Sequence, residues 1–411
     1  MKKVVLAYSG GLDTTYCAVY LSRVLGYEVH AVTVQTGGFP ETELERIERR
    51  AYELGVASFR VVDVTQAYYE QCIRYLVYGN VLKNNVYPLS VSAERMVQAM
   101  AVAEYAAALG ADAVAHGSTG AGNDQVRFDM VFQGMIPDAE IITPIRDRRL
   151  SRDEEIAFLK EQGVHMDFEK AQYSINKGLW GTSVGGRETL NSKDYLPETA
   201  WPTPVTATEP MAVTLHFERG ELTALNGSSM TPVAAIRQLQ AWAQPYGIGR
   251  DIHVGDTIIG IKGRVGFEAA APLIIIKAHH LLEKHTLTKW QLYWKDQLGT
   301  WYGNWLHEGM MLDPTMRNIE KFLEDTQQTV TGDVFVTLHP YRFAVTGVET
   351  EHDLMSGKFG AYGEMNNSWD GADVRGFARI FGNQVSIYHA VNAGKAAVPG
   401  AIENSKLKTS N

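Results

Sequence analysis

The sequence predicts an α/β protein that begins with a doubly wound parallel sheet and continues into an α+β domain and a helical arm. In the first half, short apolar runs alternate with helical stretches of about ten to fifteen residues, which is typical of a parallel sheet covered on both faces. In the second half, strands cluster with helices in no regular alternation. With 411 residues, 45% of them hydrophobic, the chain can bury two large cores. We expect three parts, residues 1–167, 168–365 and 366–411.

The first half is expected to supply five strands and the helices between them. Residues 4–7 are apolar on both pleat faces, as central strands of parallel sheets are. Acidic residues after Pro40 suit the first turn of a helix, and Ser151 with Glu154 forms a capping box at the start of another. The expected strands are 4–7, 28–34, 59–64, 113–115 and 141–144, and the expected helices are 12–25, 41–54, 66–83, 93–109 and 151–162.

The second half changes character. Residues 178–204 are rich in Gly and Pro, which indicates a long loop, and such loops usually carry function. Beyond Ser368 a last helical stretch presents Phe377, Ile380 and Phe381, and this apolar face would lie in water unless it packed on another subunit. The expected strands are 212–217, 222–225, 257–262, 273–277, 334–338 and 343–348, and the expected helices are 232–243, 278–297 and 314–326.

The turn after the first strand has the composition of an anion site. Ser9, Gly10 and Gly11 let the backbone approach a ligand, and the free N–H groups and positive dipole end of the next helix point at it. No Gly-Lys-Ser/Thr follows and the Gly-x-Gly-x-x-Gly spacing is missing, so neither a Walker loop nor a dinucleotide fingerprint is present. A Gly-rich turn without function is the plain alternative. Ser-Gly-Gly-Leu-Asp-Thr-Thr after a first strand resembles the signature of the ATP pyrophosphatase group, whose loop holds the β- and γ-phosphates and leaves the α-phosphate open to attack.

A second polar stretch, residues 116–128, follows the expected strand 113–115. It combines three glycines with Thr119, Asn123, Asp124 and Arg127. These residues are unsuited to a hydrophobic core, but they could bind a zwitterion, which needs hydrogen-bond donors for its carboxylate and acceptors for its ammonium. A solvated loop is the alternative. The agreement of two independent stretches favours the functional interpretation.

Composition argues against nucleic-acid-binding, disulfide-rich and membrane proteins. A formal net charge of −9 gives no basic footprint, so we expect no nucleic-acid partner. Cys17 and Cys72 offer neither a disulfide framework nor metal-ligand spacing, which fits a reducing compartment. The apolar stretch after Lys3 is too short for a signal sequence or a membrane span, so we expect a cytoplasmic protein without membrane association.

The two loops, together with residues 173–183 and 262–268, resemble the argininosuccinate synthase family over nearly the whole chain. The resemblance implies a nucleotide-binding domain, a synthetase domain and a C-terminal arm used to assemble a homotetramer. It also implies a ligase that joins citrulline and L-aspartate through a citrullyl-AMP intermediate, with release of AMP and pyrophosphate.

The resemblance also implies roles for individual residues. Ser9, Asp13, Asp124 and Arg127 would be catalytic, and Arg127 would pair with the citrulline carboxylate. The expected ATP-binding residues are Ala7, Tyr8, Ser9, Gly10, Gly11, Leu12, Asp13, Thr14, Thr15, Val34 and Gly117. Those expected for aspartate are Thr119, Asn123 and Asp124, and those expected for citrulline are Tyr87, Ser92, Asn123, Arg127, Ser174 and Ser183.

The ligation reaction depends more on the positioning of its substrates than on general-base catalysis. A ureido oxygen is a weak, nearly neutral nucleophile, so in-line placement and charge stabilisation on the phosphates are the expected sources of rate. Mg²⁺ is implied as the phosphate counter-ion, held without a dedicated carboxylate cage. The aspartate amine must lose a proton, either to Asp124 or to a released phosphate oxygen, and the sequence leaves this open.

The chain departs from the usual pattern of the family in its second half. Family members commonly have Glu at the positions of Gly185 and Gly255, and Tyr at the position of Phe267; Thr15 and Ala121 replace Ser and Lys. Losing two carboxylates near the citrulline α-nitrogen suggests an N-acylated substrate, since charge-assisted hydrogen bonds contribute about 1.5–3 kcal/mol each. The alternative is that Glu188 or Glu268 accepts the ammonium instead.

Two other classes stay open. One is an ATP pyrophosphatase that acts on a different amide or carboxylate acceptor, for which a basic patch or a catalytic Cys pair would be the mark. The other is a non-catalytic nucleotide-binding scaffold, which two intact polar loops argue against.

Overall fold

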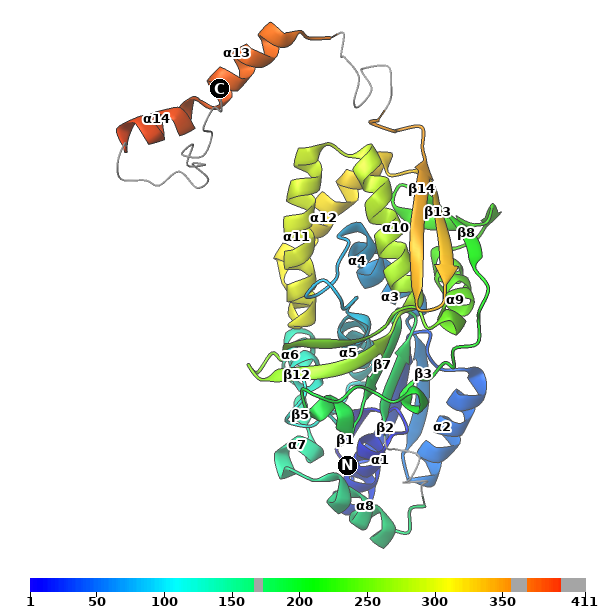
Figure 1. The fold of residues 1–411 in the computed structure, drawn as a ribbon. Helices are drawn as coiled ribbons and strands as arrows, with labels where there is room; N and C mark the ends of the chain where they lie inside the picture. Colours follow the sequence, from blue (N-terminus) through cyan, green and yellow to red (C-terminus); the bar gives the residue numbers. More distant parts are fainter. Residues whose placement is uncertain (166–172, 356–367, 393–411) are drawn as a thin grey trace. The chain divides into compact units, whose positions relative to one another are not determined.

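A computed structural model of the 411-residue chain describes all residues except 166–172, 356–367 and 393–411. The chain divides into two compact units, Met1–Asp353 and Leu354–Asn411. Within the first unit, β1 and β2 lie at the lower end of Figure 1 and β13 and β14 at the upper end, with β7 and β12 between them.

The expected parallel sheet is confirmed. Its order is β3-β2-β1-β4-β5, with every neighbouring pair parallel. The chain therefore runs outward from β1 and then returns to β4, so the sheet has a topological switch point between these two strands, where ligands of such sheets bind. The strands are β1 (Lys3–Ala7), β2 (Glu28–Gln35), β3 (Ser58–Asp63), β4 (Ala113–Ala115) and β5 (Glu140–Ile142).

Both faces of this sheet are covered. Alternate residues of a strand point to opposite sides, so neighbouring residues of β1 pack in different cores. Val4 and Leu6 pack in one core with α1 (Leu12–Val19), α2 (Glu41–Glu53) and α8 (Arg152–Glu161). Val5 packs in a second core with α5 (Ser90–Leu109). Ser151 and Glu154 form the expected capping box of α8.

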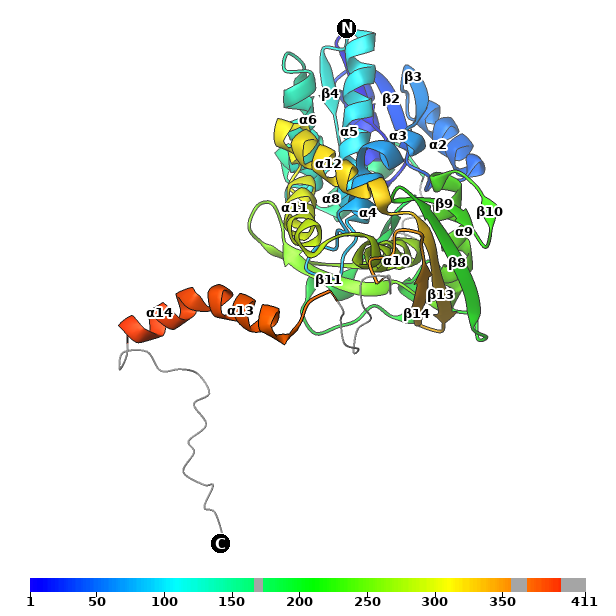
Figure 2. The same cartoon turned by 90° about the horizontal axis from the view of Figure 1, so that it is seen from above.

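Helix α5 is shared between the two halves of the first unit. It contacts β1 and β2 of the parallel sheet, and also β6 (Ser174–Gly178), β7 (Gly181–Gly185) and α11 (Lys289–His307) of the second half. Figure 2 shows α5 beside β2. Its alanines allow close packing on both sides. It begins at Ser90, three residues before the expected start, so Ser90 and Ser92 belong to its first turn.

The second half contains two antiparallel sheets. One has the order β11-β12-β7-β6, with β11 (Arg250–Asp256) and β12 (Lys262–Glu268). The other has the order β10-β9-β8-β13-β14 and packs against α9 (Pro232–Ala243) and α10 (Ala270–Thr286). Its strands are β8 (Met211–Glu218), β9 (Glu221–Leu225), β10 (Ser228–Ser229), β13 (Gly332–His339) and β14 (Arg342–Glu349).

Several sequence-based boundaries in this half were wrong. Residues 273–277, expected as a strand, lie inside α10, where Ile274, Ile275 and Ile276 are all buried. A continuous apolar run does not distinguish a buried strand from a buried helix. The expected helix 278–297 is two helices, because Thr288 starts α11 with a capping box to Gln291. Residues 178–204 were expected to form a loop, but they begin with the β6–β7 hairpin, and residues 257–262 form mainly the turn between β11 and β12.

The remaining helical elements connect these layers. The expected helix 66–83 is three short pieces that end at Tyr78, five residues early. They are α3 (Thr65–Tyr68), η2 (Tyr69–Ile73) and α4 (Arg74–Tyr78); the others are η1 (Tyr20–Val24), α6 (Asp124–Met135), α7 (Pro144–Arg148), η4 (Arg187–Leu190), η5 (Glu198–Ala200), η6 (Gln244–Tyr246), η7 (Met310–Leu312), α12 (Pro314–Thr326) and η8 (Gln327–Thr329).

The second unit contains α13 (Gly371–Phe381) and α14 (Asn383–Val391) among its described residues. Neither helix has a buried residue, and the expected apolar face is present: Phe377, Ile380 and Phe381 are all more than 60% exposed. No helix in the described parts of the chain is long and apolar enough to cross a membrane. The expected boundary near Asp167 lies outside the described residues.

Candidate active site

The first loop leaves β1 at its carboxyl end and opens α1. Gly10 has φ +75°, a left-handed conformation that glycine adopts readily, and a Cβ there would meet Ile47 at 3.1 Å. Gly11 is the N-cap residue and no side chain caps the helix. The Ser9 N–H donates to the Thr14 hydroxyl at 3.4 Å. The loop therefore presents uncapped helix N–H groups beside an exposed hydroxyl, the arrangement that binds phosphate.

The second loop touches the first. Gly117 follows β4, and a Cβ on Gly117 would lie 3.1 Å from the carbonyl carbon of Asp13 and 3.2 Å from the Thr14 nitrogen. Only a residue without a side chain lets the two turns approach so closely. The two polar stretches identified in the sequence thus meet at the switch point of the sheet.

A buried charged network begins where the second loop becomes α6. Asp124, in the first turn of α6, accepts hydrogen bonds from Arg95 Nε at 2.9 Å and from Arg127 at 3.0 Å. Arg127 is 3% exposed, and it also donates to the Ser92 hydroxyl at 3.1 Å and to the His307 carbonyl at 2.8 Å. One carboxylate therefore joins two guanidinium groups from α5 and α6, and Arg127 ties both helices to α11.

The network continues into the second half of the chain. Arg95 donates to the Asn176 side-chain oxygen on β6 at 2.6 Å, and the Asn176 amide donates to the Ser183 hydroxyl on β7 at 3.5 Å. Hydrogen bonds therefore run without interruption from β7 through Arg95 and Asp124 to α11.

The charges of this network are fixed by their neighbours. Burial by itself raises the pKa of Asp124, but Arg95 and Arg127 outweigh it and hold the pKa of that carboxyl below its usual value. Burial lowers the pKa of Arg127, against the attraction of Asp124. An arginine stays protonated at physiological pH even so, so the site keeps an ionised carboxylate and a buried cation.

Aromatic rings form a wall beside the network. The Tyr87 ring stacks on His253 of β11 at 4.9 Å between centroids and packs on Phe267 of β12 at 5.3 Å. Phe267 lies directly opposite Ser183 in the sheet register, so the rings and the network share one face of the β11-β12-β7-β6 sheet.

The sequence-predicted site residues fall into three groups. Around the first loop, Ser9 and Gly11 are exposed, whereas Tyr8, Thr15 and Val34 are buried beneath it. The charged network brings together Ser92, Asp124, Arg127 and, through Asn176, Ser183. The remaining residues border these two groups. Ala7 ends β1, and α1 begins with Leu12, Asp13 and Thr14. Thr119 and Ser174 are exposed, Tyr87 is in the ring wall, and the Asn123 side chain accepts the Ile258 N–H at 2.8 Å.

Sequence reasoning missed Arg95, Asn176, His253 and His307. Arg95 had a usable signal, since it lies three residues after Ser92 and therefore on the same helix face. The helix was expected to begin at residue 93, which hid this relation. His307 had no signal, because it is 180 residues away from Arg127 in the chain.

Two carboxyl groups meet beneath the first loop. Asp13 of α1 lies against Glu155 of α8, and Glu155 is 3% exposed. Burial and the neighbouring Asp13 raise the pKa of Glu155 to about 8, so this pair holds a proton at neutral pH. Within the described residues, no group of three or more His, Cys, Asp or Glu side chains could hold a metal ion.

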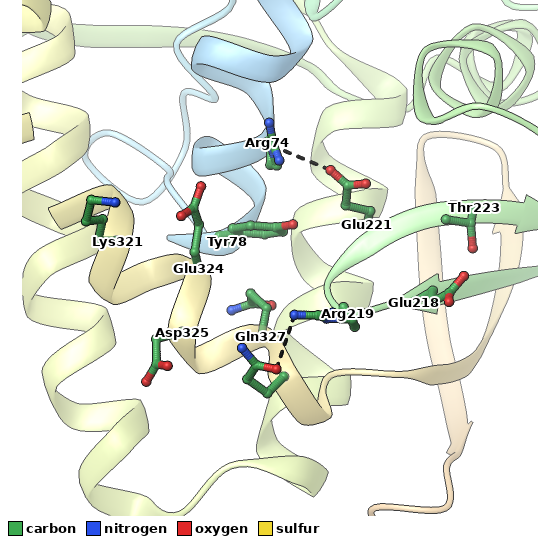
Figure 3. Close-up of a pocket in the computed structure, with 11 residues that line it drawn as sticks. Arg74, Tyr78, Glu218, Arg219, Glu221, Thr223, Lys321, Glu324, Asp325 and Gln327 are labelled. Atoms are coloured by element: carbon green, nitrogen blue, oxygen red, sulfur yellow. Dashed lines mark hydrogen bonds and ion pairs between the residues drawn. The ribbon is translucent and has the colours of Figure 1, made fainter. Parts of the chain in front are cut away.

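A separate charged groove is lined by other residues (Figure 3). It is formed by α4, the β8–β9 hairpin and α12, and includes the pairs Arg74 with Glu221 and Arg219 with Gln328. None of the sequence-predicted site residues lines it.

Comparison with known proteins identifies the family of the chain. Residues 3–165 match the family model of the argininosuccinate synthase N-terminal HUP domain, and residues 173–388 match that of the C-terminal domain. The chain belongs to the argininosuccinate synthase family. The argininosuccinate synthase of Methanocaldococcus jannaschii is 36% identical over 388 residues, covering 93% of this chain and 97% of the relative. Those of Xylella fastidiosa and Pyrococcus furiosus are 36% and 34% identical, covering 95% and 93% of this chain and 98% and 93% of theirs.

The carboxyl pair gives a testable pH dependence. A carboxyl whose pKa is raised in the folded protein binds more protons folded than unfolded, so stability falls as the pH rises from about 4.5 towards 8. Glu155→Gln resembles the protonated form and removes this loss. We expect the variant to gain stability relative to the parent between pH 5 and pH 9, by on the order of 2 kcal/mol.

Thermal-unfolding midpoints at both pH values measure this gain. Glu161→Gln, an exposed substitution at the end of the same helix, is the control and should show no such trend. A midpoint difference for Glu155→Gln that does not change with pH would contradict the assignment.

Proposed function

We propose that this chain ligates citrulline and L-aspartate to argininosuccinate, with cleavage of ATP to AMP and pyrophosphate. In the first step the citrulline ureido oxygen attacks the α-phosphorus and pyrophosphate leaves. In the second step the aspartate amine attacks the ureido carbon, AMP leaves, and the nitrogen loses a proton. The observation that carries the proposal is the meeting of an uncapped phosphate loop with a charged amino-acid site at one switch point.

The first loop binds ATP in this proposal. The N–H groups at the start of α1 and the Ser9 hydroxyl hold the β- and γ-phosphates, while Gly117 lets the second loop pack against the first turn of α1. Val34, at the end of β2, borders the adenine. Mg²⁺ arrives with ATP as a counter-ion of the phosphates, since magnesium in such sites is bound mainly by phosphate and water.

The second loop and the network bind the two amino acids. Thr119, Asn123 and Asp124 hold aspartate, and Arg127 faces the carboxylate of citrulline. Arg127 already donates to Asp124, Ser92 and His307, so it is held in one position and contributes a fixed positive charge. The preorganised donors supply the in-line placement that the weak ureido nucleophile requires.

Asp124 is a poor base for the aspartate amine. Two guanidinium groups occupy its oxygens and lower its pKa, which makes it a weak proton acceptor. The non-bridging phosphate oxygens of the departing AMP are the better acceptors, and Asp124 instead orients the two arginines.

We also propose a cytoplasmic homotetramer. The two cysteines are free and buried, as suits a reducing compartment. Besides the exposed apolar side chains of α13 and α14, α11 exposes Trp290, Trp294 and Trp301 to more than half their area. Such aromatic and apolar surfaces are typical of subunit contacts.

The reaction is tested by its products. AMP and pyrophosphate should form in equal amounts only when ATP, aspartate and a citrulline substrate are all present. Formation of ADP would contradict the proposal. Release of AMP at the same rate with and without aspartate would contradict it as well.

The role of Arg127 is tested by a charge-conserving change. Arg127→Lys keeps the cation but cannot bridge Asp124, Ser92 and His307, so we expect kcat/KM for the citrulline substrate to fall about 10- to 100-fold, with KM for ATP nearly unchanged. Arg187→Lys, at a side chain that is 92% exposed, is the matched control and should behave as the parent. An equal rise in both KM values would point to a general structural defect instead.

The role of α13 in subunit assembly is tested by introducing negative charges on either of its two faces. Phe377→Glu combined with Ile380→Glu places charges on the apolar face of α13, and we expect the assembly to dissociate to smaller species in sedimentation velocity. Arg375→Glu combined with Arg379→Glu adds two carboxylates on the opposite face and should leave the sedimentation coefficient unchanged. Dissociation by both pairs alike would show an effect of net charge only.

A further inference from the structure

Helix α5 places a second carboxyl group beside the charged network. Glu94 precedes Arg95 in this helix and is 3% exposed. Its Oε1 atom accepts hydrogen bonds from Arg95 Nη1 at 3.2 Å and from the Gln98 amide at 2.8 Å. Arg95 in turn donates through Nε to Asp124 at 2.9 Å. The Arg95 guanidinium therefore lies between two carboxyl groups, one from α5 and one from α6.

The second oxygen of Glu94 has a different environment. Oε2 is buried and has no hydrogen-bond partner in the described part of the chain. It lies against Gly178 of β6, so closely that a Cβ on Gly178 would collide with it. The same point is 3.5 Å from the Thr36 hydroxyl. A buried carboxyl oxygen that receives no donor favours the protonated form of the group, because the protonated form carries no charge and its O–H can itself donate.

The charged and titratable groups that interact with Glu94 come from three elements. They are Arg95 of α5, Asp124 of α6 and Tyr68 of α3, and burial keeps Tyr68 neutral by raising the pKa of its hydroxyl. The part of β6 against Glu94 is Gly178, which carries no charge. Burial raises the pKa of Glu94 to about 7, against the attraction of Arg95. Glu94 therefore changes its charge near neutral pH, whereas Asp124 stays ionised.

The net charge of the network depends on this one proton. The guanidinium groups of Arg95 and Arg127, with the ionised Asp124 between them, leave one net positive charge. An ionised Glu94 cancels that charge, and a protonated Glu94 preserves it. The two amino-acid substrates respond differently, because L-aspartate carries one net negative charge and citrulline carries none. A change at Glu94 should therefore act mainly on aspartate.

We propose that Glu94 is a positioning residue that holds Arg95 and, through its own protonation, sets the affinity of the site for L-aspartate. The inference rests on the proposed function, since it concerns aspartate binding in the same ligation. Oε1 can accept from Arg95 whether or not Oε2 carries a proton, so the guanidinium keeps its place and only the charge of the network changes. The protonated form attracts the aspartate anion, and the ionised form does not.

The pH dependence of the parent enzyme gives the first test. KM for L-aspartate is measured at saturating ATP and citrulline between pH 6 and pH 8. Glu94 loses its proton over this range, so KM for aspartate should rise by about three- to tenfold as the site loses one positive charge. KM for citrulline should change much less.

The outcomes separate this inference from the proposed function. A KM for aspartate that stays constant or falls with pH, together with aspartate-dependent release of AMP, would overturn the inference and leave the ligation intact. Failure of aspartate to support AMP release at any pH would overturn both.

Glu94→Gln separates charge from structure. The Gln side chain accepts from Arg95 through its oxygen and cannot ionise, so it resembles the protonated carboxyl. We expect this variant to keep a low KM for aspartate up to pH 8. Glu104→Gln, an exposed substitution in the same helix, is the control and should retain the parent's rise. The same rise in Glu94→Gln as in the parent would overturn the assignment to this carboxyl.

A neighbouring substitution should move the midpoint of the KM profile. The Gln98 amide donates to Glu94, and this bond favours the ionised carboxylate. Gln98→Met keeps the length of the side chain but removes the donor, so the rise in KM for aspartate should shift to higher pH. A midpoint that stays in place or shifts to lower pH would contradict the role of Glu94.

Discussion

The organisation of this site depends on one carboxylate held between two guanidinium groups. Asp124 neutralises Arg95 and Arg127, and each arginine then uses its remaining donors to bind a different element. Removal of Asp124 would be destabilising, because the buried Arg127 cation would lose the carboxylate that compensates its charge. The network therefore acts as a single unit, and it fixes the relative positions of α5, α6, β6 and α11.

The order of the strands places that unit beside the first loop. The chain leaves the sheet outward after β1 and returns at β4, so the loops that follow these two strands diverge around one crevice. Gly117 permits contact between the loops, and α5 supplies both a face for the parallel sheet and Ser92 and Arg95 for the network. The first loop, the second loop and the network therefore lie next to one another in the folded chain.

Strand alternation divides the side chains of the second sheet into two sets. Residues on one face of β11, β12, β7 and β6 meet the network, while those on the other face pack around Val184 and Trp201. A one-residue difference in position therefore decides which face of the sheet a side chain joins. Glu268 and Phe267 are neighbours in sequence with opposite roles for this reason.

The sequence by itself determined the features that depend on neighbours in the chain. The strand, Gly-rich turn and helix of the first loop, the capping box of Ser151, and the parallel fold class all follow from local composition and periodicity, so they could be predicted and the structure agrees. Tertiary structure decided the rest. Residues 273–277 became helix because packing on both sides overrides strand propensity, and the partners of Arg127 include His307, which only the fold brings near. The network and the contacts of the ring wall depend on long-range packing and register, which no local pattern encodes.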